Sequence, residues 1–273
     1  MSDDAFDRLL RYVEDELDFA TSYYDNAYLD RRVSSRMRRT DCEEYGAYHE
    51  LLREDEDERE ALLDAFSVNV TSFFRNPDVW AEIRSVLRSL SAENRRVRLW
   101  SAACSDGREP YSLAMLALDD PEVDESKVEI TATDIDREIL AAARRGVYQS
   151  TRTTDIDEQL APLEEYERYV EPDDGRFEVA DVVKDLVSFE RHDLINGDPK
   201  SDFDFVVCRN LFIYIDAEHK LPILDTVSKS LRKGGYLVIG KTETLPEQLK
   251  PCFEPVARRL RVYKKTDDIP IRR

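Results

Sequence analysis

The stretch from Arg96 to Leu118 combines residue types that could form one wall of a nucleotide pocket. An apolar segment runs into a cluster of small residues at 101–107, and Glu109-Pro110 then begins a helical pattern. Proline is favoured in the first turn of a helix, small residues let the backbone approach a ligand closely, and the start of a helix offers unpaired N–H groups. Gly107 is the only glycine of the loop, so the GxGxxG pattern of dinucleotide-binding folds is absent. Because Glu109 is a carboxylate, this pocket would repel a phosphate group and attract a cation.

A second candidate is Asp134, which ends an apolar segment 27 residues after Gly107. An acid at the end of the second strand is where α/β nucleotide sites bind ribose hydroxyls, and no arginine adjoins it to favour NADP. Alternatively, Asp134 caps the helix that starts near Asp136, and the two roles are compatible. Together with Glu109, it favours S-adenosylmethionine, which has a ribose and an adenine, a cationic methionine end and no phosphate. A turn at 233–235 (Lys-Gly-Gly) before a late strand also suits a methyltransferase sheet.

These residues need a parallel α/β sheet to position them. From about residue 95 the sequence alternates between strand and helix patterns, which predicts a parallel sheet with helices on both faces. Residues 147–190 are acidic and turn-rich and interrupt this alternation, which predicts an inserted subdomain. The elements expected are strand 97–100, helix 109–118, strand 128–133, helix 136–145, a short helix near 155–163, short strands at 175–179 and 186–190, a buried strand at 203–215, helix 217–231, strand 236–240 and a last strand at about 256–264.

The first 90 residues show helical periodicity and predict a separate helical domain. Its expected helices cover 3–19, 28–40, a segment that begins with a capping box at Thr40–Glu43, 54–66, and a segment that begins at Asn76-Pro77.

The second of these helices carries five arginines within nine residues, in a chain whose net charge is −19. They are Arg31, Arg32, Arg36, Arg38 and Arg39. On a helix, residues three and four apart share a face, so Arg32, Arg36 and Arg39 lie together. The run is either a docking patch for an acidic partner or a solvated face that pairs with neighbouring acids. Because it opposes the global charge, we favour docking.

Composition excludes several classes of protein. A net charge of −19 disfavours binding to nucleic acid or to an anionic membrane, and no apolar run reaches the roughly 18 residues of a membrane span. The acidic N-terminus is no signal peptide, and four scattered cysteines without a CxxC motif indicate reduced thiols of a cytoplasmic protein. Three histidines far apart argue against a metal site. Ten lysines against thirty arginines, with this acidity, favour a halophilic source over an ordinary acidic protein.

Four separated motifs resemble one family, in the right order and over nearly the whole chain. They are VNVTSFFRN (68–76), WSAACSDGREPYSLA (100–114), ATDIDREIL (132–140) with RRGVY (144–148), and VVCRNLFIYID (206–216). They resemble the CheR family, chemotaxis receptor methyltransferases that use S-adenosylmethionine to esterify receptor glutamates. The resemblance implies an α/β fold with a class I methyltransferase-like, mostly parallel sheet at 91–273. It also implies an all-helical domain at 1–90 and a small inserted antiparallel β subdomain at 147–190.

The resemblance also implies roles for single residues. The positions matched to cofactor contacts are Asn69, Thr71, Arg75, Glu109, Asp134, Asp193, Leu194, Arg209 and Asn210. Among them, Glu109 would hold the methionine end, Asp134 the ribose, and Asp193, which stands where the family usually has asparagine, the adenine side. Arg75 would lie near the transferring methyl group and the incoming carboxylate, and Tyr214 would face the substrate. The catalytic set is therefore Arg75, Arg209 and Tyr214. Alternatively, Arg75 pairs with an acid and Asn210 is a buried turn residue.

The acceptor would be a glutamate of the receptor's cytoplasmic helical bundle, reached through the basic helix at 28–40. A glutamate side chain has a pKa near 4.3, so it is already ionised at neutral pH and needs no general base. The loop at 171–179 has a single glycine, whereas family members that bind a tethered receptor peptide have a glycine-rich loop, so we expect no such binding. The alternatives are a class I methyltransferase with another acceptor and a cofactor-binding chemotaxis protein without turnover. A dinucleotide-dependent oxidoreductase is disfavoured by the glycine-poor loop.

Overall fold

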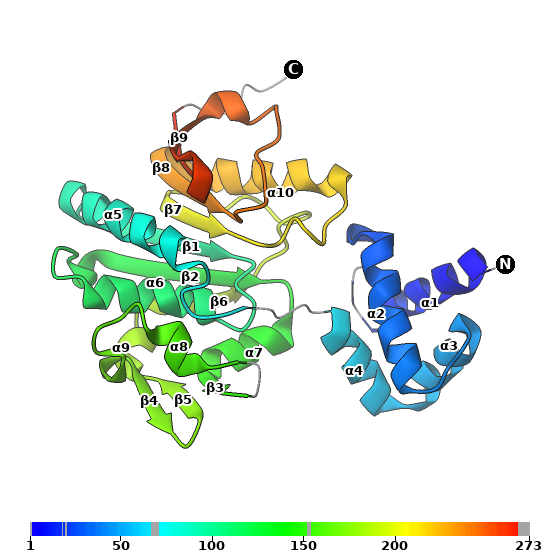
Figure 1. The fold of residues 1–273 in the computed structure, drawn as a ribbon. Helices are drawn as coiled ribbons and strands as arrows, with labels where there is room; N and C mark the ends of the chain where they lie inside the picture. Colours follow the sequence, from blue (N-terminus) through cyan, green and yellow to red (C-terminus); the bar gives the residue numbers. More distant parts are fainter. Residues whose placement is uncertain (1, 18, 20, 67–70, 152–153, 267–273) are drawn as a thin grey trace. The chain divides into compact units, whose positions relative to one another are not determined.

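A computed structural model describes residues 2–17, 19, 21–66, 71–151 and 154–266. The chain forms two compact units (Figure 1). The helical unit comprises Met1–Val70 and Phe212–His219, and the sheet unit comprises Thr71–Leu211 and Lys220–Arg273. The sequence placed the boundary near residue 90, but α5 (Pro77–Glu93) packs in the core of the sheet unit.

The helical unit contains α1 (Ser2–Glu16), η1 (Thr21–Tyr23), α2 (Asn26–Arg39), α3 (Tyr45–Glu54) and α4 (Glu56–Phe66). Helix α1 packs on α3 and α2 on α4, around a core of leucines and aromatic rings. The capping box expected at Thr40–Glu43 is wrong. Thr40 ends α2, its N–H donates to the carbonyls of Arg36 and Met37, and Asp41 follows with φ of 54°. This left-handed residue turns the chain, so α3 begins only at Tyr45.

The sheet unit is built on seven strands in the order β6-β2-β1-β7-β8-β10-β9. They are β1 (Val97–Ala102), β2 (Val128–Asp134), β6 (Val187–Arg191), β7 (Phe203–Cys208), β8 (Leu231–Ile239), β9 (Phe253–Ala257) and β10 (Val262–Lys265). The first five run parallel, β10 runs antiparallel to β8, and β9 pairs antiparallel with β10, so β10 alone among these seven strands runs against the others. All six residues of β7 are buried, as expected for the centre of a parallel sheet. The mostly parallel α/β sheet predicted from the sequence is confirmed.

Helices cover this sheet. They are α5, α6 (Arg108–Asp119), α7 (Arg137–Arg145) and α10 (Ala217–Ser230), with short turns η2 (Glu125–Lys127), η4 (Lys250–Cys252) and η5 (Arg258–Leu260). Helix α6 contacts β1 and β2, with α5 beside it, and α7 contacts β2 and β6. The strand expected at 203–215 ends at residue 208, and the single strand expected at 256–264 is the hairpin β9–β10. None of the described helices is long and apolar enough to span a membrane.

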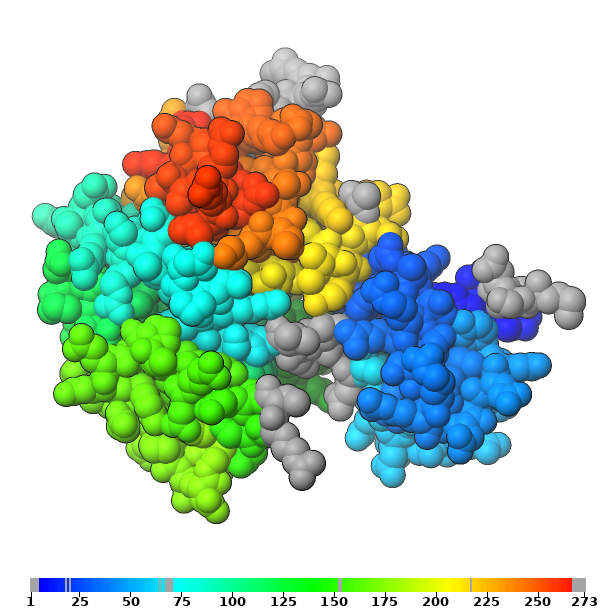
Figure 2. All heavy atoms as spheres, viewed as in Figure 1, coloured from blue at the N-terminus to red at the C-terminus, as the bar shows by residue number. Residues whose placement is uncertain are grey.

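The inserted subdomain carries its own three-stranded antiparallel sheet, β3-β5-β4. Its elements are β3 (Val147–Gln149), α8 (Ile156–Leu160), η3 (Tyr166–Arg168), β4 (Val170–Asp173), β5 (Arg176–Val179) and α9 (Asp181–Lys184). Their atoms gather in one lobe, drawn in green in Figure 2. The strand expected at 186–190 is β6, which pairs with β2 at the edge of the main sheet and lies outside this subdomain.

Candidate functional site

The loop between β1 and α6 is tightly folded. Ala103, Ser105 and Gly107 all have positive φ, at 59°, 51° and 91°, a conformation that is uncommon for residues other than glycine. At Gly107 a Cβ atom would lie 3.0 Å from the Cβ of Ala143 and 3.2 Å from the hydroxyl oxygen of Tyr148. Positive φ and close packing together explain why a glycine stands at position 107.

Asp134 at the end of β2 holds this loop. One carboxylate oxygen accepts the N–H of Ser105 at 2.8 Å, and the other accepts the N–H of Asp136 at 3.2 Å. Burial raises the pKa of Asp134, and these backbone hydrogen bonds oppose the rise. The cap of α7 is Asp136, whose side chain accepts two N–H groups of the first helical turn, so the capping role considered for Asp134 is wrong. Since a carboxylate has about four acceptor sites, Asp134 retains capacity for the hydroxyls of a ligand.

Glu109 and Arg209 form a buried ion pair between the start of α6 and the end of β7. Their closest charged atoms, Oε2 and Nη1, are 3.6 Å apart, and the exposed fractions of the side chains are 15% and 1%. Burial raises the pKa of Glu109, while Arg209 and a 2.8 Å hydrogen bond from Ser101 oppose this. Burial lowers the pKa of Arg209, and Glu109 opposes that. Each side chain therefore stabilises the other in its charged form.

Arg209 also fixes the segment that precedes α5. Its Nη2 atom donates to the carbonyl of Arg75 and to Oδ1 of Asn76, both at 2.9 Å. Its guanidinium carbon lies 5.9 Å from the ring centroid of Trp80. Asn76 stands at the N-cap position of α5, but its side chain accepts no hydrogen bond from the helix. The Asn-Pro pair marked the helix start correctly, whereas the bond to Arg209 had no signal in the sequence.

Two further predicted cofactor residues, Arg75 and Thr71, belong to the same unit. Burial raises the pKa of Glu109, and the positive charge of the half-buried Arg75 opposes this rise less strongly than Arg209 and Ser101 do. The Thr71 carbonyl accepts a 2.8 Å hydrogen bond from Arg108. Asn69 lies outside the described residues.

Asp193 and Leu194 follow β6, where the N–H of the preceding residue, His192, donates to the Asp134 carbonyl at 3.0 Å. The Asp193 carboxylate accepts the N–H groups of residues 195 and 196, which form a local turn. Partial burial raises the pKa of Asp193, but these hydrogen bonds outweigh it and leave the pKa below its usual value. Leu194 is buried. The predicted adenine contact of this pair stays a prediction.

Tyr214 belongs to the helical unit. Its ring centroid lies 5.0 Å from that of Tyr28, and its carbonyl accepts the N–H of Asp25 at 3.1 Å. It is therefore partly buried against the core of that unit, and its predicted role in facing the substrate stays a prediction.

The basic run on α2 divides into two kinds of arginine. Arg31, Arg38 and Arg39 are exposed, and the guanidinium of Arg32 lies over the ring of Tyr28. Arg36 instead forms a two-point pair with the buried carboxylate of Glu58 on α4, to which the Tyr48 hydroxyl also donates, at 2.5 Å. The prediction that Arg36 is part of a docking patch is therefore wrong, because its side chain is engaged inside the unit.

The Arg36–Glu58 pair should be essential for stability of the helical unit. In an Arg36→Ala variant, Glu58 keeps its buried position and loses its cation, which typically costs about 3–5 kcal/mol. Urea unfolding of the full chain is monitored by circular dichroism. We expect the first transition to move to a lower urea concentration, by an amount that corresponds to this loss of free energy. Arg39→Ala, on the exposed side of the same helix, is the matched control and should shift it by less than about 0.5 kcal/mol. Equal shifts in the two variants would show that the pair is not stabilising.

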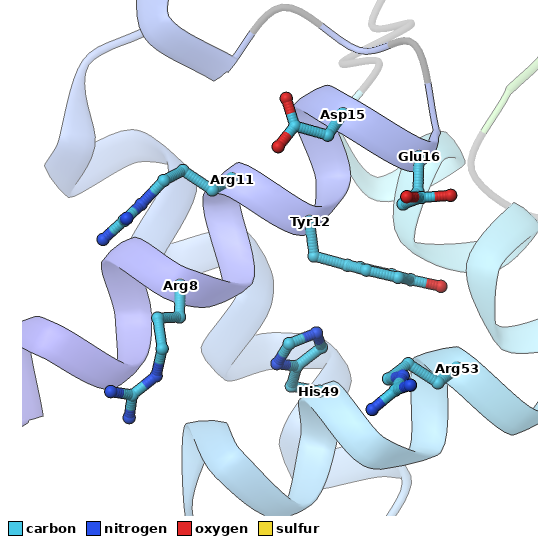
Figure 3. Close-up of a pocket in the computed structure, with 7 residues that line it drawn as sticks. All are labelled: Arg8, Arg11, Tyr12, Asp15, Glu16, His49 and Arg53. Carbon is cyan, nitrogen blue, oxygen red and sulfur yellow. The ribbon is translucent and has the colours of Figure 1, made fainter.

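A groove of about 610 Å³ lies between α1 and α3 (Figure 3). It is lined by Arg8, Arg11, Tyr12, Asp15, Glu16, His49 and Arg53. The ring of Tyr12 lies 4.8 Å from that of His49, and the two acids lie beyond Tyr12 along α1, on the side away from His49. Because charges of both signs line the groove, it shows no clear preference for an acidic partner. Its exposed arginines lie on α1 and α3, so they can serve as controls for the arginines of α2.

The fold and these residues define a class of protein. A mostly parallel sheet with an acid at the end of β2, a glutamate in the first turn of α6 and a glycine-poor loop is the arrangement of a class I, S-adenosylmethionine-dependent methyltransferase. The residues fit that cofactor, since the loop meets two carboxylates, Asp134 and Glu109, suited to hydroxyl and cationic groups.

Comparison with known proteins identifies the family. The family model described as "CheR methyltransferase, SAM binding domain" matches residues 69–261. A second family model, described as "CheR methyltransferase, all-alpha domain", matches residues 4–67. The chain belongs to the CheR methyltransferase family, as the sequence motifs indicated.

Relatives agree with this assignment. A chemotaxis protein methyltransferase of Listeria monocytogenes is 34% identical over 237 residues, which cover 86% of this chain and 88% of the relative. Chemotaxis protein methyltransferase 1 of Vibrio cholerae is 35% identical over 197 residues, covering 69% and 70%. Among solved structures, the glycopeptide N-methyltransferase MtfA complexed with S-adenosyl-L-methionine matches 57% of this chain and 48% of its own, with 18% identity and a TM-score of 0.35.

Proposed function

We propose that this chain transfers the methyl group of S-adenosylmethionine to glutamate side chains of chemoreceptors and so forms methyl esters. The observation that carries the proposal is the placement of Arg75, a cation whose backbone is held by Arg209 beside the buried Glu109. An arginine can bind a carboxylate at two points, which suits an acceptor that is an anion. The bound cofactor supplies an electrophilic methyl group whose sulfur leaves as a neutral thioether.

The residues of the chain then need only to bind and orient. A glutamate carboxylate is ionised at neutral pH, so its oxygen forms the new C–O bond without losing a proton. Arg75 orients the carboxylate, and Glu109 with Arg209 holds the cofactor end of the site. Orientation of this kind can supply up to roughly 7–11 kcal/mol of the barrier, which accounts for a site that has no general base in its proposed set.

The decisive experiment uses the purified chain, S-adenosylmethionine with a tritiated methyl group, and a receptor cytoplasmic fragment. We expect label on the fragment that is released as methanol by mild alkali, because methyl esters hydrolyse there and N-methyl groups do not. Peptide mapping should place it on glutamates. Alkali-stable label would favour another acceptor, and cofactor binding without any label would favour a non-catalytic chemotaxis protein.

The exposed arginines of α2 are proposed to dock the acidic receptor bundle. Reversing two charges, in Arg38→Glu with Arg39→Glu, should raise KM for the receptor fragment at low salt by about tenfold or more and leave cofactor affinity unchanged. At 1 M salt the Debye length is about 3 Å, so the difference should shrink. KM is measured by initial rates at both ionic strengths.

The matched control reverses two exposed arginines of the α1–α3 groove, in Arg11→Glu with Arg53→Glu. The change of net charge is the same, so a similar rise in KM would mean that only global charge matters and would remove α2 as the docking surface.

We propose further that no tethered receptor peptide is needed. Strands β4 and β5 are joined by only two residues, Asp174 and Gly175, both with positive φ. This is the tight hairpin turn that matches strand twist, and it leaves no extended loop for a peptide. The cytoplasmic location and the halophilic source remain predictions from composition.

A further inference from the structure

A buried carboxylate that the sequence did not single out contacts one of the predicted cofactor residues. Glu243 follows β8 and is 4% exposed. Its Oε2 atom accepts the N–H of Gly240 at 2.5 Å and the N–H of Asn210 at 3.2 Å. A Cβ atom at position 240 would lie 2.6 Å from that same oxygen, so the carboxylate occupies space that only a glycine leaves open. The Glu243 carboxylate is therefore held by backbone N–H groups at the end of β8.

The hydrogen bond to Asn210 connects Glu243 with the predicted site. Asn210 directly follows the buried Arg209 and has φ of 63°, a left-handed conformation. For a residue other than glycine this conformation requires support from its surroundings. The N–H···O bond from Asn210 to Glu243 provides such support, so Glu243 fixes the turn that carries Arg209 and Asn210 at the end of β7.

Glu243 also acts through its charge. After the larger effects of burial and nearer groups, its negative charge raises the pKa of both Glu109 and Arg209. Arg75 acts on the same two groups, so the charges of Glu243, Glu109, Arg75 and Arg209 are coupled to one another. S-adenosylmethionine carries one positive charge in total, whereas the product S-adenosylhomocysteine is neutral. Removing the negative charge of Glu243 from this group penalises the cationic cofactor more than the neutral product.

We propose that Glu243 is a positioning residue that sets the Arg209–Asn210 turn and whose charge makes the site favour S-adenosylmethionine over S-adenosylhomocysteine. The inference rests on the predicted cofactor contacts of Glu109 and Arg209 and is independent of the methyl acceptor. The proposed role of Glu243 would be the same if the methyl acceptor were another carboxylate or an amine. Failure to methylate a receptor would therefore contradict the proposed function but not this role of Glu243.

The test compares Glu243→Gln with Glu243→Ala by calorimetric titration of the full chain with each ligand. Glutamine keeps an oxygen that accepts both N–H groups but has no charge. We expect Glu243→Gln to raise Kd for S-adenosylmethionine about five- to tenfold, the size of a nearby unit charge at an effective dielectric constant near 20, and Kd for S-adenosylhomocysteine less than twofold. Glu243→Ala should weaken both ligands, since the turn loses its support.

Glu247→Gln is the matched control, because Glu247 lies on the same segment with its side chain 83% exposed. It should change neither Kd. Equal losses for the two ligands in Glu243→Gln would reduce Glu243 to a structural role, and unchanged affinities would overturn the proposal outright. If Glu243→Ala fails to fold, judged by thermal unfolding, the ratio of the two Kd values in Glu243→Gln still decides. Wild-type chain that binds neither ligand would overturn the cofactor site itself.

Discussion

Replacing Arg75 with alanine should lower the methylation rate by about 100-fold or more while Kd for S-adenosylmethionine changes less than about threefold. Arg75 is proposed to orient the acceptor carboxylate, and its positive charge acts on both Glu109 and Arg209. Losing one positioned charge-stabilising donor commonly costs 10²–10³ in turnover. Its backbone carbonyl, which Arg209 binds, survives the substitution, so the fold of the site should persist. Initial rates at saturating cofactor and calorimetric Kd values separate the two effects.

Arg75→Lys provides the control for geometry. Lysine keeps the charge but lacks the planar fork that binds a carboxylate at two points, so we expect it to recover only part of the lost rate. Full recovery would mean that charge alone matters. If Arg75→Ala weakened cofactor binding as much as turnover, the residue would be a cofactor ligand and not the group that orients the acceptor.

Replacing Asp134 with alanine should weaken S-adenosylmethionine binding by about 100-fold or more. The carboxylate holds the β1–α6 loop through the N–H of Ser105, and we propose that it also accepts hydrogen bonds from the ribose of the cofactor. Hydrogen bonds to a charged group contribute about 1.5–3 kcal/mol each, and two of them correspond to at least two orders of magnitude in Kd. Titration of the variant with S-adenosylmethionine and with S-adenosylhomocysteine should show the loss for both, because both carry the ribose.

Asp136→Ala is the matched control, two residues along the same segment. Asp136 caps α7, and loss of a cap costs roughly 1 kcal/mol of stability without touching the loop. We therefore expect a lowered unfolding temperature and an unchanged Kd. Binding that survives in Asp134→Ala, or that is lost equally in Asp136→Ala, would contradict the assignment of the ribose site.

Most of the features that were predicted correctly depend on the pattern of neighbouring residues in the sequence. The strand, loop and helix of residues 96–118 and the acid at the end of β2 depend on neighbours in the chain, and the structure has them as expected. The role of Arg36 could not be predicted in this way, because its partner Glu58 lies 22 residues away on another helix. A single arginine in a basic run looks the same whether it is solvated or paired.

Three other differences also have a physical cause that lies beyond the local sequence pattern. The amphipathic pattern of α5 shows that one face is buried but not against which core, so the helix was assigned to the wrong neighbour. The apolar run at 203–215 resembles one long strand, yet it belongs to two units. Strand β7 ends at Cys208 in the sheet unit, whereas Phe212–His219 is part of the helical unit, where Tyr214 packs against the core. Glu243 was missed because an isolated glutamate in a turn normally faces water.

The helical unit is assembled from segments far apart in the order of synthesis. Its first 70 residues are made some 140 residues before Phe212–His219, which completes the unit through backbone hydrogen bonds to Tyr23 and Asp25. During translation the four helices therefore lack these hydrogen-bond partners until most of the sheet unit has been synthesised. A fragment that stops near residue 70 would lack the same segment. The smallest self-sufficient piece of this protein thus extends at least through His219, and the two units should mature together rather than one after the other.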